Sequence, residues 1–237
     1  MSPDATTATI LVQPLPLPFL PDAVIFDMDG LMLDSERAIN LCMARAAREL
    51  GHDLPDTLWL QMIGGGDGLC RRLLAERIGG EATDVLLDRA EAMYDAVADA
   101  GIDHRPGIVD LLEFLVARGI PRAVATSTRR PLAVRKLAAA GLAPYFDAVC
   151  TSSDVPRPKP APDVYLLAAS TLGVAPSRCL VLEDSPTGVR AALAAGMTPI
   201  QVPDLLEPDD EVRALRHRIV QSLGEAQRLL EARLAIG

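Results

Sequence analysis

Short apolar runs that end in polar residues recur along the chain. The first extends from Ala23 to Phe26, and four more occupy residues 123–126, 146–150, 179–182 and 199–202. An unbroken apolar run of this length is typical of a strand that is covered on both faces, as in a parallel sheet. Stretches rich in Ala, Leu and Arg flank these runs, and the alternation predicts an α/β fold with a doubly wound parallel sheet.

The stretch between the first two predicted strands is too long for a single crossover helix. It carries four helical patterns that are separated by glycines, at residues 38–50, 58–63, 69–78 and 82–98. We therefore expect an all-helical cap at residues 36–103. It would be inserted into an α/β core made of residues 21–35 and 104–237.

The first 20 residues differ from the rest of the chain. They contain alternating prolines and have no Lys or Arg ahead of their short apolar stretch, so they lack the basic start of a signal peptide. We expect a flexible, extended leader there.

Composition narrows the classes of protein that fit. Of 237 residues, 49% are hydrophobic and 23% are charged, as in ordinary globular proteins, and no apolar run approaches the length of a membrane span. The net charge of −9 argues against a nucleic-acid surface, because such surfaces neutralise phosphates with basic residues. The four cysteines form no CxxC pair and the three histidines have no ligand spacing. We therefore expect no zinc site or disulfide and a cytoplasmic location.

Two aspartates follow the first predicted strand directly. Asp27 and Asp29 precede Gly30, and the period of two in a strand would place both carboxylates on the same side. Ligands of open α/β sheets bind at the carboxyl ends of the strands, so we expect these carboxylates in that crevice. A solvated loop with two acids and a turn glycine is the alternative for this string taken alone.

Polar residues also follow the other predicted strands. Thr126 and Ser127 end the second, Lys159 follows the third, and Glu183 and Asp184 end the fourth. Because these ends converge, four carboxylates would share one pocket, where two charges about 4 Å apart repel by roughly 4 kcal/mol at an effective dielectric of 20. A divalent cation would remove this conflict, and oxygen ligands favour Mg²⁺. Asp184 is the expected ligand, with Glu183 as a second candidate.

This set of residues suits phosphoryl transfer. As a hypothesis, Asp27 attacks phosphorus and forms an aspartyl-phosphate, while Asp29 protonates the leaving oxygen and later deprotonates a water molecule. Thr126, Ser127 and Lys159 would bind the phosphoryl oxygens.

Four strings in the order DMDGLMLDSE, VATST, RPKPAPDVY and VLEDSPTGVRAALAAGM resemble the motifs of the haloacid dehalogenase superfamily. The resemblance is to the branch that contains β-phosphoglucomutase and small-molecule phosphatases. It implies a Rossmann-like core with a helical cap, Mg²⁺ as cofactor, a phosphoaspartyl intermediate and a monomer. The matching motif positions imply Asp27 as nucleophile, Asp29 as acid/base, Thr126 and Lys159 as phosphate ligands, and Asp27, the Asp29 carbonyl and Asp184 as metal ligands.

Two cap positions depart from the β-phosphoglucomutase pattern. Ile39 stands where that pattern has a histidine, and Asp67 where it has an arginine. A mutase must hold a bisphosphate by its second phosphate, and neither residue supplies a cation for it. Arg71 could substitute, or it could belong to a solvated helix face. The resemblance therefore favours a phosphatase acting on a small phosphomonoester, such as a sugar phosphate, with a sugar phosphate mutase as the alternative.

Two further cap residues have open interpretations. Glu36 could reach a substrate hydroxyl, or it could be a favourable charge in the first turn of a helix. Gly65, in the triple glycine 64–66, could belong to a hinge or approach the substrate closely, or it could simply interrupt a helix.

Two non-enzymatic alternatives need weighing. Response-regulator receiver domains, which accept a phosphoryl group, also combine an acidic cluster, Ser/Thr and Lys on a parallel sheet. The long helical insertion and the DxDG string argue against that interpretation. A binding protein that has lost its chemistry is disfavoured because every motif residue is present.

Overall fold

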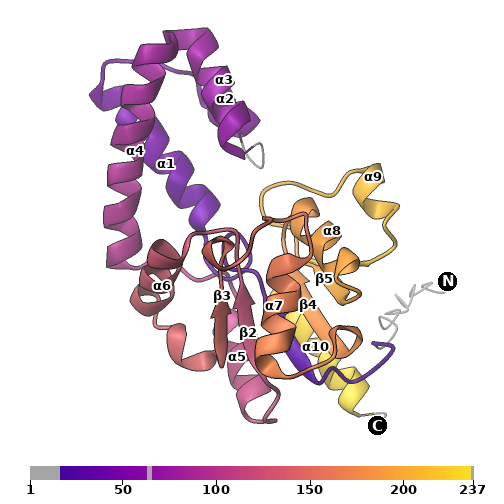
Figure 1. The fold of residues 1–237 in the computed structure, drawn as a ribbon. Helices are drawn as coiled ribbons and strands as arrows, with labels where there is room; N and C mark the ends of the chain where they lie inside the picture. The colour runs from indigo at the N-terminus through magenta and orange to yellow at the C-terminus, as the bar shows by residue number, and fades with distance from the viewer. Residues whose placement is uncertain (1–16, 63–65, 236–237) are drawn as a thin grey trace, which may run out of the picture.

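The computed structural model describes residues 17–62 and 66–235. Its centre is a parallel sheet of six strands in the order β3-β2-β1-β4-β5-β6 (Figure 1). The strands are β1 Ala23–Phe26, β2 Arg122–Ala125, β3 Ala148–Cys150, β4 Cys179–Glu183, β5 Thr198–Gln201 and β6 Arg218–Ile219. The predicted doubly wound parallel sheet is confirmed. The two-residue strand β6 was not predicted, since so short a run carries no recognisable pattern.

The two faces of the sheet are covered by different helices. Val24 and Phe26 of β1 pack into one buried cluster with α5 and α10, whereas Ala23 and Ile25 pack into a second one with α7 and α8. This alternation follows from the period of two in a strand. The helices of the core are α5 Ile108–Val116, α6 Arg130–Ala139, α7 Asp163–Leu172, α8 Pro186–Ala194, α9 Asp210–Arg213 and α10 Leu223–Leu234.

Four of the helices between β1 and β2 form a lobe at the top of Figure 1, and α5 follows them as part of the core. They are α1 Ser35–Glu49, α2 Asp56–Met62, α3 Gly66–Ile78 and α4 Gly80–Ala100. This cap has a buried cluster of its own, which includes Met43, Leu58, Leu74 and Leu86. The helical insertion after the first strand is confirmed, and its limits at residues 36 and 103 stay a prediction.

The two chain segments that join the cap to the core pair with each other. Leu33 forms an antiparallel bridge with His104, and the backbone N–H of Arg105 donates to the carbonyl of Met32 at 2.8 Å. Asp204, in the loop after β5, accepts from Arg37 at 3.0 Å and from Arg105 at 2.6 Å. One core carboxylate therefore holds both connecting segments.

Part of the predicted leader is ordered against the core. Leu17 is buried in the cluster that contains β1, and the guanidinium of Arg178 lies 5.0 Å from the ring centroid of Phe19. Leu17 and Phe19 thus contact the core, whereas Pro18 and Leu20 are exposed, and the flexible leader stays a prediction. Residues 1–16 lie outside the described part of the chain.

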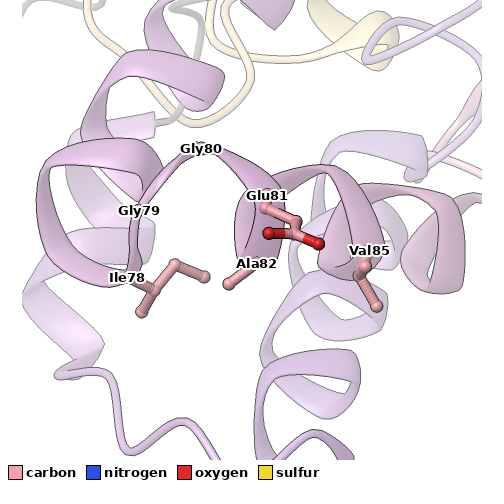
Figure 2. Close-up of a pocket in the computed structure, with 6 residues that line it drawn as sticks. All are labelled: Ile78, Gly79, Gly80, Glu81, Ala82 and Val85. Carbon is pink, nitrogen blue, oxygen red and sulfur yellow. The ribbon is translucent and has the colours of Figure 1, made fainter.

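A hollow on the cap lies at the connection between α3 and α4. It has a volume of about 460 Å³ and is lined by Ile78, Gly79, Gly80, Glu81, Ala82 and Val85 (Figure 2). None of these residues follows a strand, and Glu81 is the only ionisable side chain among them. None of the described helices combines the length and the apolar character that crossing a membrane requires.

We expect Leu86→Ala to lower the free energy of unfolding of the cap by about 2–5 kcal/mol, because it opens a cavity at a fully buried position. Val85→Ala, at the neighbouring position with 51% of the residue exposed, should change it by less than about 0.5 kcal/mol. The only tryptophan, Trp59, packs against the cap cluster, so its fluorescence during urea unfolding measures the cap directly. Equal midpoints for the two variants would contradict the packing described here.

Candidate active site

Lys159 joins two carboxylates at the carboxyl ends of β1 and β4. Its Nζ donates to Asp27 Oδ1 at 2.6 Å and to Glu183 Oε1 at 2.7 Å, and only 3% of its side chain is exposed. Asp27 directly follows β1 and is 6% exposed. Burial, together with the charges of Glu183 and Asp29, raises the pKa of Asp27, although Lys159 opposes this shift. The structure therefore brings the predicted nucleophile and the predicted phosphate-binding lysine into direct contact.

Glu183 has its two oxygens engaged by protein donors. Oε1 accepts from Lys159 and from Tyr165 Oη at 2.9 Å, and Oε2 accepts from Ser185 N at 2.9 Å and from Ser185 Oγ at 3.0 Å. Against the cost of burial, these contacts lower the pKa of Glu183. A Cβ on Gly188 would lie 1.5 Å from Oε1, so the first turn of α8 can pack here only with glycine. The role of Glu183 as a second metal ligand stays a prediction, and each of its oxygens already accepts two hydrogen bonds from the protein.

Asp184 lies against the turn that follows β1. A Cβ on Gly30, whose φ is +81°, would lie 2.3 Å from Asp184 Oδ2. Glycine is needed there both for the left-handed backbone and for the room that the carboxylate occupies. Burial and the charges of Glu183 and Asp27 raise the pKa of Asp184 well above its ordinary value. Asp27 and Asp184 are thus two neighbouring carboxylates whose ionisation is disfavoured.

Asp29 turns to a different set of partners from Asp27. The strand ends at Phe26, so the period-two argument does not extend to Asp29. One of its oxygens forms an ion pair with Lys136 of α6, and the other accepts from Thr128 Oγ1 at 2.6 Å. Burial alone would raise the pKa of Asp29, but Lys136 and Thr128 outweigh it and lower the pKa.

The two residues predicted at the end of β2 differ in exposure. Thr126 is 1% exposed, and its Oγ1 accepts from the backbone N–H of Thr128 at 3.0 Å. Ser127, between them, is exposed to solvent. The hydroxyl of Thr126 therefore stabilises the turn after β2, and Ser127 is the more accessible of the two.

Of the predicted cap residues, Glu36 lies near the carboxylates of the site and Arg71 is paired elsewhere. Glu36 is partly buried in the first turn of α1, and burial followed by the charges of Asp29 and Asp204 raises its pKa. It therefore lies near the carboxylates. Arg71 instead forms an exposed ion pair with Asp84 of α4. Gly65 and the side chain of Asp67 lie outside the described residues.

The charges of this cluster do not balance. The carboxylates of Asp27, Asp29, Glu183 and Asp184 face two ammonium groups, which leaves two negative charges uncompensated when all are ionised. Within residues 17–62 and 66–235, no group of three or more His, Cys, Asp or Glu side chains is arranged to hold a metal. Two carboxylates and a backbone carbonyl remain, namely Asp27, Asp184 and the Asp29 carbonyl. This oxygen set fits a cation that keeps several of its water ligands, as Mg²⁺ does.

Sequence reasoning missed four residues that support the site. Thr128 and Lys136 hold Asp29, Tyr165 holds Glu183, and Tyr94 Oη accepts from Lys136 Nζ at 2.8 Å. One signal could have identified Lys136. The chain has only two lysines, and both lie in this cluster.

Comparison with known proteins agrees with the geometry. Residues 21–196 match the family model of the haloacid dehalogenase-like hydrolases. Hexitol phosphatase A of Escherichia coli is 36% identical over 75% of this chain and 81% of its own length. The "Phosphorylated carbohydrates phosphatase" of Thermotoga maritima is 31% identical over 89% of this chain and 91% of its own length.

Among solved structures, a candidate β-phosphoglucomutase from Thermotoga maritima superposes with a TM-score of 0.76 at 27% identity. The match covers 91% of this chain and 99% of that one. The resemblance identified from the four motifs is confirmed, and it extends to the branch of β-phosphoglucomutases and sugar phosphatases. The chain belongs to the haloacid dehalogenase-like hydrolases.

Proposed function

We propose that this protein is a Mg²⁺-dependent phosphatase that hydrolyses a small phosphomonoester through an aspartyl-phosphate on Asp27. The observation that carries the proposal is the contact of Lys159 with Asp27 at the carboxyl end of β1. A compact ammonium beside the nucleophile can bind a phosphoryl oxygen as a point charge and hold the group in line for attack.

The reaction then takes two displacements. In the first, a carboxylate oxygen of Asp27 bonds to phosphorus, the ester oxygen leaves, and Asp29 gives it a proton. In the second, Asp29 takes a proton from water, whose oxygen bonds to phosphorus and releases Asp27 and inorganic phosphate. Asp29 ends as it began, so one water molecule is consumed for each ester.

Asp27, Asp184 and the Asp29 carbonyl would hold Mg²⁺. When bound, the ion would neutralise part of the negative charge on the carboxylates and on the phosphoryl group. Lys159 and the end of β2, at Thr126 and Ser127, would bind the phosphoryl oxygens on the protein side.

A phosphorylated sugar or sugar alcohol is the substrate class that we propose. The names of two relatives, a hexitol phosphatase and a phosphorylated carbohydrates phosphatase, support it. Glu36, which the charges of Asp29 and Asp204 reach, would accept a hydrogen bond from a hydroxyl of such a substrate. Against a mutase, Ile39 is uncharged and Arg71 is paired with Asp84, so neither supplies a free cation for a second phosphate.

Replacing Asp27 by Asn should lower kcat at least about a thousandfold, because the amide is a poor nucleophile, while circular dichroism stays unchanged. Asp22→Asn is the matched control: Asp22 precedes β1, at the opposite end of the strand from Asp27, and pairs with exposed Arg178. Its kcat should stay within about twofold. The measurement is phosphate release from sugar phosphates, and substantial turnover by Asp27→Asn would rule out the nucleophile.

Removal of the metal with EDTA should abolish phosphate release, and Mg²⁺ should restore it. Mg²⁺ should also raise the melting temperature of the free protein, because a ligand that binds only the folded state stabilises it. The increase should be lost in Asp184→Asn. Full activity in EDTA would contradict the metal site, and an undiminished thermal shift in the variant would contradict its ligand.

The mutase alternative predicts a different product. We expect ³¹P NMR to show inorganic phosphate accumulating from hexose phosphates over many turnovers, with no interconversion of the 1- and 6-phosphates when a hexose bisphosphate primer is present. Interconversion with little phosphate release would reverse the proposal in favour of a mutase. A single phosphorylation without turnover would favour a phospho-acceptor.

A further inference from the structure

Lys136 is a buried cation in a helix that otherwise contributes apolar side chains to the core. Its neighbours Ala133 and Leu137 pack in the buried cluster that contains Val24 and Phe26 of β1. Lys136 itself is 2% exposed. A buried ion pair is costly, and an apolar residue at such a position is often as stable or more so. Stability therefore gives a weak reason for a lysine here, and the contacts of its ammonium group give a stronger one.

The ammonium group connects three parts of the molecule. Nζ pairs with Asp29 Oδ1 in the turn after β1 and donates to Tyr94 Oη at 2.8 Å. Tyr94 belongs to α4 of the cap, and its ring centroid lies 5.3 Å from Nζ. The cap thus contacts Lys136, which in turn contacts the predicted acid/base residue.

The carboxylate of Asp29 is fixed at both oxygens. Lys136 holds Oδ1, and Thr128 Oγ1 donates to Oδ2 at 2.6 Å. Two donors from different elements stop the carboxylate from rotating. Because each carboxylate oxygen has two lone-pair sites, an oxygen held in this way can still exchange a proton with a substrate.

We propose that Lys136, braced by Tyr94 of the cap, is a positioning residue that aims the Asp29 carboxylate at the leaving-group oxygen. The inference rests on the proposed phosphatase activity and adds to it residues on α6 and α4 that contact neither the phosphoryl group nor the metal. It also makes the aim of Asp29 depend on the cap, since Tyr94 moves with α4.

The test compares two substrates that differ in their need for a proton. The leaving group of an alkyl phosphate, such as a hexitol phosphate, is an alkoxide that must be protonated. The leaving group of p-nitrophenyl phosphate is p-nitrophenolate, which leaves without a proton. We expect Lys136→Met to lower kcat/KM for the alkyl ester at least about tenfold more than for p-nitrophenyl phosphate. This difference is part of the contribution of about 10²–10⁴-fold that acid–base catalysis makes as a whole. Lys136→Arg should recover part of the loss.

A double-mutant cycle separates positioning from a structural effect. In an Asp29→Asn background, Lys136→Met should cause no further loss of kcat/KM with the alkyl ester, because a residue that acts through Asp29 has nothing left to position. That double variant also removes both members of the ion pair, so it leaves no buried charge unpaired.

A neighbouring residue supplies the matched control. Arg135 precedes Lys136 on α6 and pairs with Asp95 of α4 at 2.6 Å, so it crosses the same helix contact, but at the surface. Arg135→Met should leave both kcat/KM values within about twofold. Should Lys136→Met fail to fold, Tyr94→Phe removes only the hydroxyl, and it should reduce kcat/KM for the alkyl ester severalfold more than for the aryl ester.

Equal losses with the two esters, or a further loss in the Asp29→Asn background, would overturn the inference. So would an Arg135→Met variant that shows the same preference for the aryl ester as Lys136→Met. Failure of the proposed function gives a different result: the wild-type protein would then release no phosphate from either ester, and the inference would fall with it before any variant is compared.

Discussion

Four carboxylates, two buried and two partly buried, surround two lysines at the carboxyl edge of the sheet, and this cluster constrains the rest of the structure. Charges removed from water are tolerated only where partners surround them. Tyr165 and Ser185 complete the shell of Glu183, and Gly188 and Gly30 make room for Glu183 and Asp184 where any Cβ would collide. The tyrosine, the serine and the two glycines therefore have one common purpose, which is to keep this charge cluster inside the fold.

The lysines divide the carboxylates between two tasks. Lys159 ties Asp27 to Glu183, whose saturated oxygens make it an anchor for the lysine. Lys136 forms a separate ion pair with Asp29 and donates a hydrogen bond to Tyr94 of the cap. Asp184 has no cation of its own among these pairs, so the uncompensated charge falls on Asp27 and Asp184 together. The same two carboxylates are the candidate metal ligands, and a bound cation would offset the cost of burying their charge.

The sequence predicts the parts of the site that strand ends supply. Asp27, Lys159 and Asp184 follow apolar runs, and the convergence of parallel strands is general, so their proximity could be argued without coordinates. Lys136 could not be placed in this way, because it lies in the middle of a helix and meets Asp29 across 107 positions of sequence. For Glu183 the sequence predicts the position in the cluster, but only coordinates show that its oxygens accept hydrogen bonds from Lys159, Tyr165 and Ser185. The orientation of Asp29 could not be derived from strand periodicity, because β1 ends at Phe26, three residues before it.

Lysine and arginine occupy different places in this structure. The chain has 23 basic residues, of which only Lys136 and Lys159 are lysines, and both are buried among carboxylates. Arginines such as Arg71, Arg135 and Arg178 form exposed pairs instead. A guanidinium is planar and needs a wide fork of acceptors, whereas an ammonium is compact and can be shared between acceptors in different directions. Lys159 does this between two carboxylates, and Lys136 between a carboxylate and a phenol. A compact cation that reaches acceptors in two directions suits both positions, so the identity of these two residues follows from the geometry of the cluster they neutralise.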